Sequence, residues 1–236
     1  MSDVFIVAAK RTPIGKSELP VKGIFVRFTF CKFTFDFVGA LNGSLASIPS
    51  HELGSTLIKN VISETKVAPE DVSEVILGQV LGCGQGQNPA RQAALNAGLP
   101  NTVPAMGVNM VCGSGLRSVA LAAQAIKCGD SNIVIAGGQE SMSQAVHFSH
   151  LRNGIKFGNT ELKDSLLVDG LTDAFDNIHM GITAENVAKE FNIRYLGSSI
   201  LNPIVLLLYD LRLGCRRLHI IDALSHVHAG NLIIFT

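Results

Sequence analysis

Hydrophobic residues between positions 39 and 193 follow two alternating periods along the chain. In residues 51–66, HELGSTLIKNVISETK, five apolar side chains recur at helical spacing on one face: Leu53, Leu57, Ile58, Val61 and Ile62. Residues 73–81, SEVILGQVL, are a short run with β-branched residues, which is typical of a buried strand. Strands that alternate with helices predict a parallel or mixed sheet covered on both faces.

The same alternation continues after the first helix and strand. Residues 88–99, NPARQAALNAGL, predict a helix with Asn88 as its N-cap and Pro89 at its first position. Near the start of the chain, residues 4–9, VFIVAA, are an apolar run between charged residues and predict a further strand. This run is too short, and begins too acidic, to be a signal peptide.

A strand, a helix and a second strand are predicted around the middle of the chain. Residues 104–112, PAMGVNMVC, predict a strand that ends at Cys112. Residues 114–129, SGLRSVALAAQAIKCG, predict a helix that closes on its final glycine. Residues 132–138, NIVIAGG, predict a buried strand.

Two segments depart from this rhythm. Residues 17–38 hold six of the 12 phenylalanines, and their alternating pattern predicts a strand or a hairpin. Residues 194–236 mix helix-like and strand-like fragments without a clean period. We interpret the first segment as an insert and the second as an atypical tail, both derived from retained or misread non-coding sequence.

Composition excludes several classes of function. The 19 basic and 19 acidic residues balance, so no charge excess predicts binding to nucleic acid or to an anionic membrane. The five cysteines form no CxxC pair and have no histidines at zinc-ligand spacing, so we expect free thiols and no metal. The longest apolar stretch, residues 204–209, is far too short to cross a membrane. Together these features predict a soluble cytoplasmic protein.

Three motifs could carry chemistry. GCGQGQ, residues 82–87, lies between a strand and a helix, but its spacing does not match a dinucleotide fingerprint, so a tight glycine turn is the better interpretation. Cys112 precedes Gly113 and the predicted helix, whose N-terminus would stabilise a thiolate. A buried structural thiol is an equally good interpretation of that cysteine from local sequence. In residues 173–186, His179 and Met180 could face a ligand or be structural.

Taken together, five segments closely resemble the thiolase family, and within it the cytosolic acetyl-CoA C-acetyltransferases. They are VFIVAAKRTPIG, GQVL with GQNPARQAAL, NMVCGSGLRSVALAAQAIKCGD, IVIAGGQESMS and LTDAFDNIHMGITAENVAKEF. The resemblance covers residues 1–16 and 39–193. It implies an α/β fold, namely the layered α/β/α N-terminal half of a thiolase with a mixed and incomplete sheet. Residues 1–193 would be that domain, with a loop region over residues 143–193, and 194–236 the tail.

The resemblance also implies a reaction and the residues that serve it. Cys112 matches the family's nucleophile, which takes an acetyl group from acetyl-CoA in a ping-pong scheme that joins two acetyl-CoA into acetoacetyl-CoA and CoA, or the reverse. Leu171, His179 and Met180 match positions that line the CoA and acyl tunnel. The CoA thioester is the substrate, so no cofactor is expected. The family places such a transferase in lipid metabolism as a homo-oligomer.

Part of the family's catalytic apparatus matches nothing in residues 194–236. Thiolases use a histidine in a Gly-His-Pro run as the base for the nucleophile, and a second cysteine in a Cys-x-Gly run as the base for the second substrate. Neither run occurs in the tail. Because losing a general base costs about 10²–10⁴ in rate, we expect this chain to be inactive or severely impaired in condensation. The alternative is a non-catalytic, truncated form that binds CoA or pairs with full-length thiolase subunits.

Overall fold

The computed structural model describes residues 4–12, 41–43, 45–192 and 231–235. The hairpin predicted over residues 17–38, and residues 194–230 of the tail, lie outside the described residues. The chain forms two compact units, one of residues 1–146 with 227–236 and the other of residues 147–226. We describe each unit by itself.

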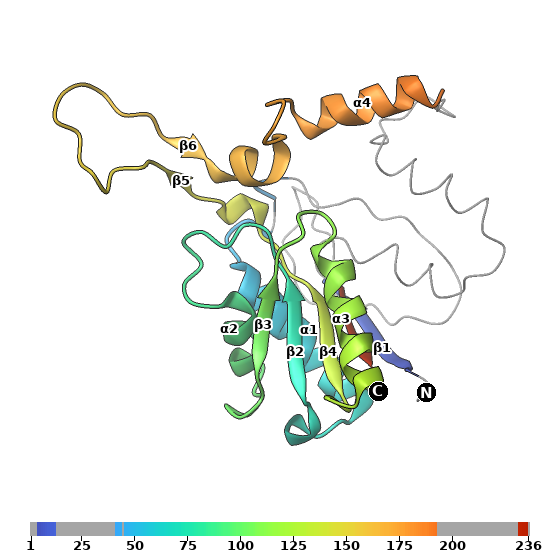
Figure 1. Ribbon diagram of the computed structural model, residues 1–236. Coiled ribbons are helices and arrows are strands. Elements are labelled where there is room, and N and C mark those ends of the chain that lie inside the picture. The colour runs from blue at the N-terminus through green and yellow to red at the C-terminus, as the bar shows by residue number, and fades with distance from the viewer. Residues whose placement is uncertain (1–3, 13–40, 44, 193–230, 236) are drawn as a thin grey trace. The chain divides into compact units, whose positions relative to one another are not determined.

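The first unit is built on one mixed sheet with the strand order β1-β7-β4-β2-β3 (Figure 1). The strands are β1 (Ile6–Arg11), β2 (Glu74–Gly78), β3 (Ala105–Val108), β4 (Val134–Gly138) and β7 (Asn231–Phe235). β2 pairs in parallel with both β3 and β4, whereas β7 runs antiparallel between β4 and β1. The predicted α/β class with a mixed sheet is confirmed, and the end of the tail supplies one of the strands.

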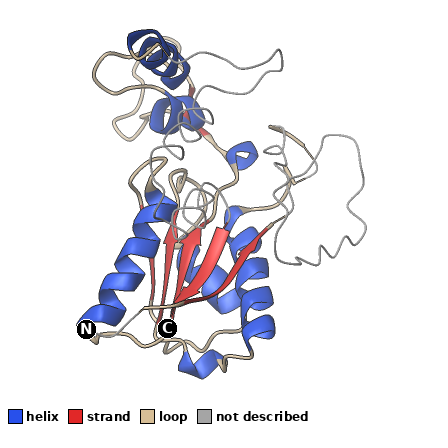
Figure 2. Cartoon of the chain, turned by 90° about the vertical axis from the view of Figure 1, so that its right-hand side faces the viewer, coloured by secondary structure: helices blue, strands red, loops and turns tan. Residues whose placement is uncertain are grey.

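In the described part of the first unit, three helices cover the two faces of this sheet: α1 (Ser50–Thr65), α2 (Pro89–Asn96) and α3 (Ser114–Cys128). α1 and α2 pack together on one face and α3 packs on the other, so that helices lie on both sides of the strands (Figure 2). Short 3-10 helices, Pro69–Asp71 and Met142–Gln144, occur in the connections. The three layers that the alternating periods predicted are confirmed.

The main core lies between α1, α2 and the sheet. Twelve buried residues form it: Leu57, Ile58, Val61, Val72, Val75, Leu77, Ala90, Ala93, Ala94, Leu99, Val103 and Ile135. The predicted apolar face of α1 supplies the first three of these residues, and α2 contributes the three alanines. Small side chains on α2 allow the two helices to pack closely, and each fully buried leucine, isoleucine or valine contributes about 1.5–3 kcal/mol.

The ends of α2 and α3 follow the sequence signals. Asn88 caps α2, because its Oδ1 accepts a hydrogen bond from the N–H of Arg91 at 3.0 Å, and Pro89 occupies the first turn. The Nδ2 of Asn88 donates to the carbonyl of Ala105 at 2.9 Å, which ties the helix to β3. α3 ends at Gly129, whose φ of +82° suits a left-handed C-cap.

We expect Asn88→Ala to lower the free energy of unfolding by about 1–2 kcal/mol. The substitution removes the cap of α2 and its link to β3, and it places alanine at a φ of +42°. Asn60→Ala is the matched control, because Asn60 is exposed within α1 and its amide bonds, within the part of the chain that the structure describes, to the carbonyl of Thr56 one turn earlier. Urea unfolding measures both variants, and equal losses would contradict the capping role.

Over residues 147–192, the described part of the second unit, there are two short antiparallel strands and two helices. These are β5 (His147–Phe148), β6 (Lys163–Asp164), a π-helix (Leu166–Leu171) and α4 (Met180–Glu190). An antiparallel bridge joins Thr172 to His179, at the residue just before α4 begins. Among the described residues of both units, no helix is long and apolar enough to cross a membrane.

Candidate functional site

Cys112 lies in a turn of residues 109–113 that joins β3 to α3. The prediction that the strand continues to Cys112 is wrong, because β3 ends at Val108. The physical reason is the side chain of Asn109, whose Oδ1 accepts the N–H of Val111 at 3.0 Å. Such a local bond to the backbone competes with strand pairing and closes a turn.

The turn is strained and strongly held. Val111 has a φ of +47°, which is a rare conformation for a β-branched residue and a cost that the surroundings must offset. Ser114 is 4% exposed, and its Oγ accepts the N–H of Met110 at 2.9 Å while it donates to the carbonyl of Val111 at 2.5 Å. The N–H of Gly113 also donates to the carbonyl of Met110 at 3.0 Å.

Cys112 itself is exposed on this turn, directly before the N-cap of α3, Gly113. The interpretation of Cys112 as a buried structural thiol is therefore wrong. Cys83 and Cys128 are free and exposed as well. What distinguishes Cys112 from them is its place at the start of a helix, on a turn whose backbone is held by several hydrogen bonds.

The first turn of α3 rests directly on the end of β2. A Cβ added at Gly78 would lie 2.5 Å from the N of Gly115 and 2.7 Å from the carbonyl oxygen of Ser114. Ser118 strengthens the same contact further along the helix, because its Oγ donates to the carbonyl of Gly137 in β4 at 2.7 Å. A glycine at the end of β2 therefore allows the helix, and with it the Cys112 turn, to approach the sheet.

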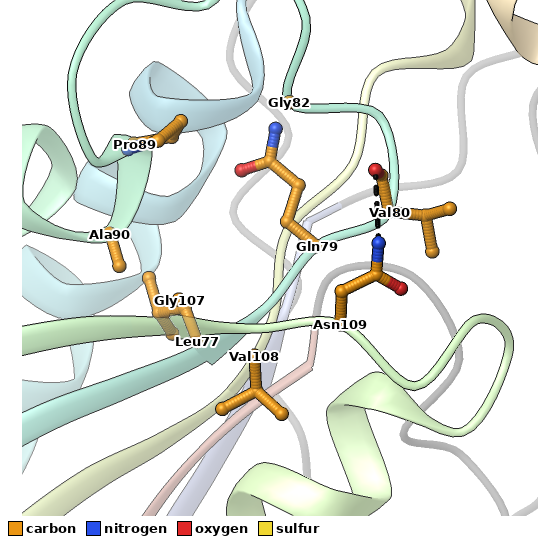
Figure 3. A pocket seen from close by; sticks show the side chains of 9 residues that line it. All are labelled: Leu77, Gln79, Val80, Gly82, Pro89, Ala90, Gly107, Val108 and Asn109. Atoms are coloured by element: carbon orange, nitrogen blue, oxygen red, sulfur yellow. Dashed lines mark hydrogen bonds between the residues drawn. The ribbon is translucent and has the colours of Figure 1, made fainter. Parts of the chain in front are cut away.

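A cavity of about 250 Å³ opens at the carboxyl ends of β2 and β3, beside the start of α2 (Figure 3). Its lining residues are Leu77, Gln79, Val80, Gly82, Pro89, Ala90, Gly107, Val108 and Asn109. The carboxyl ends of parallel strands are where α/β proteins usually bind ligands. Asn109 lines this cavity and is also the first residue of the turn that carries Cys112, so that turn begins at the cavity wall.

A chain of polar side chains lies beside the cavity. Gln139 is 2% exposed, and its Nε2 donates to the Oε1 of Gln79 at 2.9 Å. The Nε2 of Gln79 in turn donates to the Oγ of Ser50 at 3.0 Å and to the carbonyl of Leu81 at 3.1 Å. The Oε1 of Gln139 is buried without a hydrogen-bond partner among the described residues. These bonds fix Gln79, the polar residue at the end of β2.

Glu140 connects the chain after β4 to the chain after β2. Its Oε2 accepts the N–H of Val80 at 2.8 Å, and both of its oxygens lie 3.3 Å from the N of Leu81. Burial raises the pKa of Glu140, and hydrogen bonds from the N–H groups of Val80, Leu81 and Ser141 oppose that rise. The carboxyl group is therefore a partly desolvated acceptor for consecutive backbone donors.

The GCGQGQ segment forms the tight glycine turn that its spacing predicted. Gly84 and Gly86 have φ values of +73° and +82°, which glycine adopts readily. The Nε2 of Gln92, in α2, donates to the carbonyls of Gln85 and Gln87 at 2.9 and 2.8 Å. These two bonds hold the backbone of the turn against α2. The motif thus shapes the approach to α2.

Leu171, His179 and Met180 lie together within the second unit. Leu171 ends the π-helix, and the bridge between Thr172 and His179 brings it beside the start of α4, where Met180 is the first residue. His179 is the N-cap, and its Nδ1 accepts the N–H of Gly181 at 3.0 Å. The structure therefore groups these three residues with each other. Cys112 belongs to the first unit.

Sequence reasoning did not single out Asn109 and Ser114, which hold the turn that carries Cys112, or Glu140, which bonds to the chain after β2. A polar residue directly after the apolar run of β3 was the available signal for Asn109, and Glu140 is the second polar residue after the apolar run of β4. Ser114 carried no signal beyond its place at a helix start. Among the described residues, no three histidine, cysteine or acidic side chains gather in a way that could hold a metal ion.

Comparison with known proteins adds a family match. The thiolase N-terminal domain matches residues 35–195. The cytosolic acetyl-CoA acetyltransferase of Rattus norvegicus is 60% identical over 156 residues, which cover 66% of this chain and 39% of that protein. The acetyl-CoA acetyltransferase of Cupriavidus necator is 52% identical over 194 residues, covering 82% and 43%.

Solved structures agree with the sequence match. The Acat5 thiolase from Ascaris suum, in complex with coenzyme A, is 32% identical with a TM-score of 0.68, and the match covers 81% of this chain and 44% of that one. The Bacillus anthracis acetyl-CoA acetyltransferase is 31% identical with the same TM-score, covering 82% and 43%. The chain thus spans about two fifths of the length of these relatives.

Proposed function

The chain belongs to the thiolase family, and from that premise we propose that Cys112 accepts an acetyl group from acetyl-CoA. The observation that carries the proposal is the exposed thiol on the hydrogen-bonded turn before α3. The names of the relatives support acetyl-CoA as the substrate. The rat and mouse relatives are named cytosolic, and we propose the same compartment for this chain.

The step is a simple exchange of thioesters. The sulfur of Cys112, as thiolate, attacks the carbonyl carbon of acetyl-CoA, and the bond from that carbon to the sulfur of CoA breaks. The acetyl group stays on Sγ, and the CoA thiolate takes up a proton equivalent to the one that Cys112 gave up. The positive end of the α3 dipole lies at this first turn, where the N–H of Ser114 is already bonded to the carbonyl of Val111, and it favours negative charge on the carbonyl oxygen of the intermediate.

Three residues of the second unit are proposed to bind the substrate. Leu171 and Met180 are half-buried apolar side chains, and a small apolar wall suits the methyl group of an acetyl thioester. The Nδ1 of His179 is already an acceptor for the N–H of Gly181, so its Nε2 is the ring nitrogen that can bond to CoA. We propose that these residues line the path of CoA, which is substrate here and not a resident cofactor.

We limit the proposal to acyl acceptance for a reason of sequence. The 236 residues hold no Gly-His-Pro run and no Cys-x-Gly run, which thiolases use for the condensation step. The same observation supports a second candidate, in which the chain binds CoA or pairs with full-length thiolase subunits without turnover. Transfer of an acetyl group from acetyl-CoA to the pure chain separates the two, because a covalent acetyl group on Cys112 is incompatible with the second candidate.

The release of CoA tests the acyl step. Acetyl-CoA mixed with the wild-type chain is expected to release about one CoA per chain in a burst, since acylation frees CoA and the acyl-enzyme persists. Cys112→Ser should abolish this burst. Cys128→Ser is the matched control, because Cys128 is an exposed thiol at the opposite end of α3. A burst of equal size from Cys112→Ser would contradict the proposal.

A further inference from the structure

The carboxylate of Glu140 is placed where two turns at the carboxyl edge of the sheet meet. It follows β4, yet it accepts the N–H groups of Val80 and Leu81, sixty and fifty-nine residues earlier, just after β2. Those two donors lie beyond the last strand residue, Gly78, where the ladder no longer pairs them. Burying a carboxyl group costs free energy unless the group is hydrogen-bonded. The bonds from the N–H groups of Val80 and Leu81 therefore offset the cost of burying Glu140.

The turn that Glu140 holds is attached to the chain after β3. The N–H of Gln79 donates to the carbonyl of Val108 at 3.0 Å, which extends the pairing of β2 and β3 by one bond. The Nδ2 of Asn109 reaches the carbonyl of Val80 across a long bond of 3.5 Å (Figure 3). Both bonds link the segment after β2, at Gln79 and Val80, to the end of β3, at Val108 and Asn109. We therefore expect a shift of Val80 to move Asn109.

Asn109 in turn shapes the backbone that carries the thiol. Its Oδ1 accepts the N–H of Val111, the residue with a φ of +47° that directly precedes Cys112. A valine leaves that conformation readily when its restraints weaken, since the strain is of the order of 1–3 kcal/mol. The direction of the Cys112 backbone therefore depends on the bond from Asn109.

We propose that Glu140 is a positioning residue for Cys112, which acts through Val80, Asn109 and Val111. Glu140 does not touch the substrate; it fixes the turn against which the Cys112 turn is held. The consequence for acyl transfer rests on the proposed function, but the consequence for the conformation of residues 109–114 does not. The two can therefore be measured separately.

Three substitutions of Glu140 and one control test this role. Glu140→Ala removes the acceptor, Glu140→Asp withdraws the carboxylate by one methylene, and Glu140→Gln keeps an oxygen that can accept from Val80. Glu74→Ala is the control, because Glu74 is a half-buried carboxylate at the other end of β2 that accepts from the Oγ of Ser131 at 2.7 Å. The Glu74→Ala variant therefore loses a comparable hydrogen bond, but at the opposite end of β2.

Hydrogen exchange, read by mass spectrometry on peptides of the full chain, is the primary measurement. In Glu140→Ala, the N–H groups of residues 110–114 should exchange about tenfold or more faster than in the wild type, as expected when a hydrogen-bonded turn opens locally. Glu140→Asp should show a smaller increase and Glu140→Gln should restore most of the protection. Glu74→Ala should leave this segment unchanged. If Glu140→Ala does not fold, the contrast between Glu140→Asp and Glu140→Gln decides.

The burst of CoA release is the second measurement. A displaced nucleophile should acylate about 10–100-fold more slowly in Glu140→Ala, since small misplacements are costly in rate, while Glu74→Ala keeps the wild-type rate. A wild-type chain that releases no CoA would refute the proposed function, and exchange would still decide the role of Glu140. Protection of residues 110–114 that is the same in Glu140→Ala and Glu74→Ala would overturn the positioning role.

Discussion

Replacing Gly78 with alanine is expected to destabilise the chain by about 3 kcal/mol, at the upper end of the cost of overpacking a core. The added Cβ would lie 2.5 Å from the N of Gly115 and 2.7 Å from the carbonyl oxygen of Ser114. Both atoms belong to the backbone of the first turn of α3, so no side-chain rotation relieves the collision. The helix start must move away from β2, and the turn that carries Cys112 must move with it.

Gly107→Ala is the matched control for stability. Gly107 occupies the adjacent strand, and the nearest atom to an added Cβ there is the carbonyl oxygen of Leu77 at 4.0 Å, an ordinary contact. Urea unfolding should therefore show a loss of less than about 1 kcal/mol, or a small gain, for this control. Equal unfolding midpoints for the two variants would show that α3 does not rest on Gly78 as described.

Gly54→Ala is expected to cost about 2–3 kcal/mol for a related reason. Gly54 faces the interior from α1, and an added Cβ would collide with the Oε1 of Gln139 and lie 3.2 Å from the Cβ of Ala93. The collision involves a side chain in this case. Gln139 is 2% exposed, so its amide has little room to move away.

A double substitution separates the two glycines. Removing the amide with Gln139→Ala in the Gly54→Ala background should restore about 1 kcal/mol or more relative to additivity, because residues in contact couple. The same Gln139→Ala should restore nothing in the Gly78→Ala background, where the collision is with backbone atoms. Additive losses of unfolding free energy for the Gly54 and Gln139 pair would contradict the contact.

The elements of the first unit could be predicted because local signals agree with their tertiary environment. The apolar spacing of α1 places Leu57, Ile58 and Val61 in the core, where they are at most 4% exposed. Asn88 with Pro89, and Gly129, mark helix ends through bonds to neighbouring residues, which a sequence window contains. Where the forces are local, the sequence was sufficient.

The features that could not be predicted depend on distant partners. Residues 231–235 form β7 because β1 and β4, far away in the chain, offer unpaired strand edges. The bond of Glu140 to Val80 spans sixty residues, and nothing around Glu140 in the sequence identifies its partner. The early end of β3 is an exception, because the bond from the N–H of Val111 to the side chain of Asn109 is local. The apolar residues on either side of Asn109 favoured a continuous strand instead.

The candidate site was predicted in part for the same reason. Glycines after Cys112 indicated a turn into a helix, and the structure has that turn, but local sequence could not decide whether the thiol was exposed. The resemblance to thiolases selected Cys112, and the structure adds the restraints that hold its backbone. The roles of Leu171, His179 and Met180 stay predictions, although the structure groups the three around the start of α4.

Intact-mass analysis with peptide mapping, after incubation of the chain with acetyl-CoA, shows whether Cys112 accepts the acetyl group. We expect one acetyl group per chain, located on Cys112 and absent in Cys112→Ser. Hydroxylamine should remove it, as it removes a thioester. A soluble, folded chain whose Cys112 reacts with iodoacetamide but gains no acetyl group would contradict acyl acceptance by Cys112 and leave binding as the function of this site.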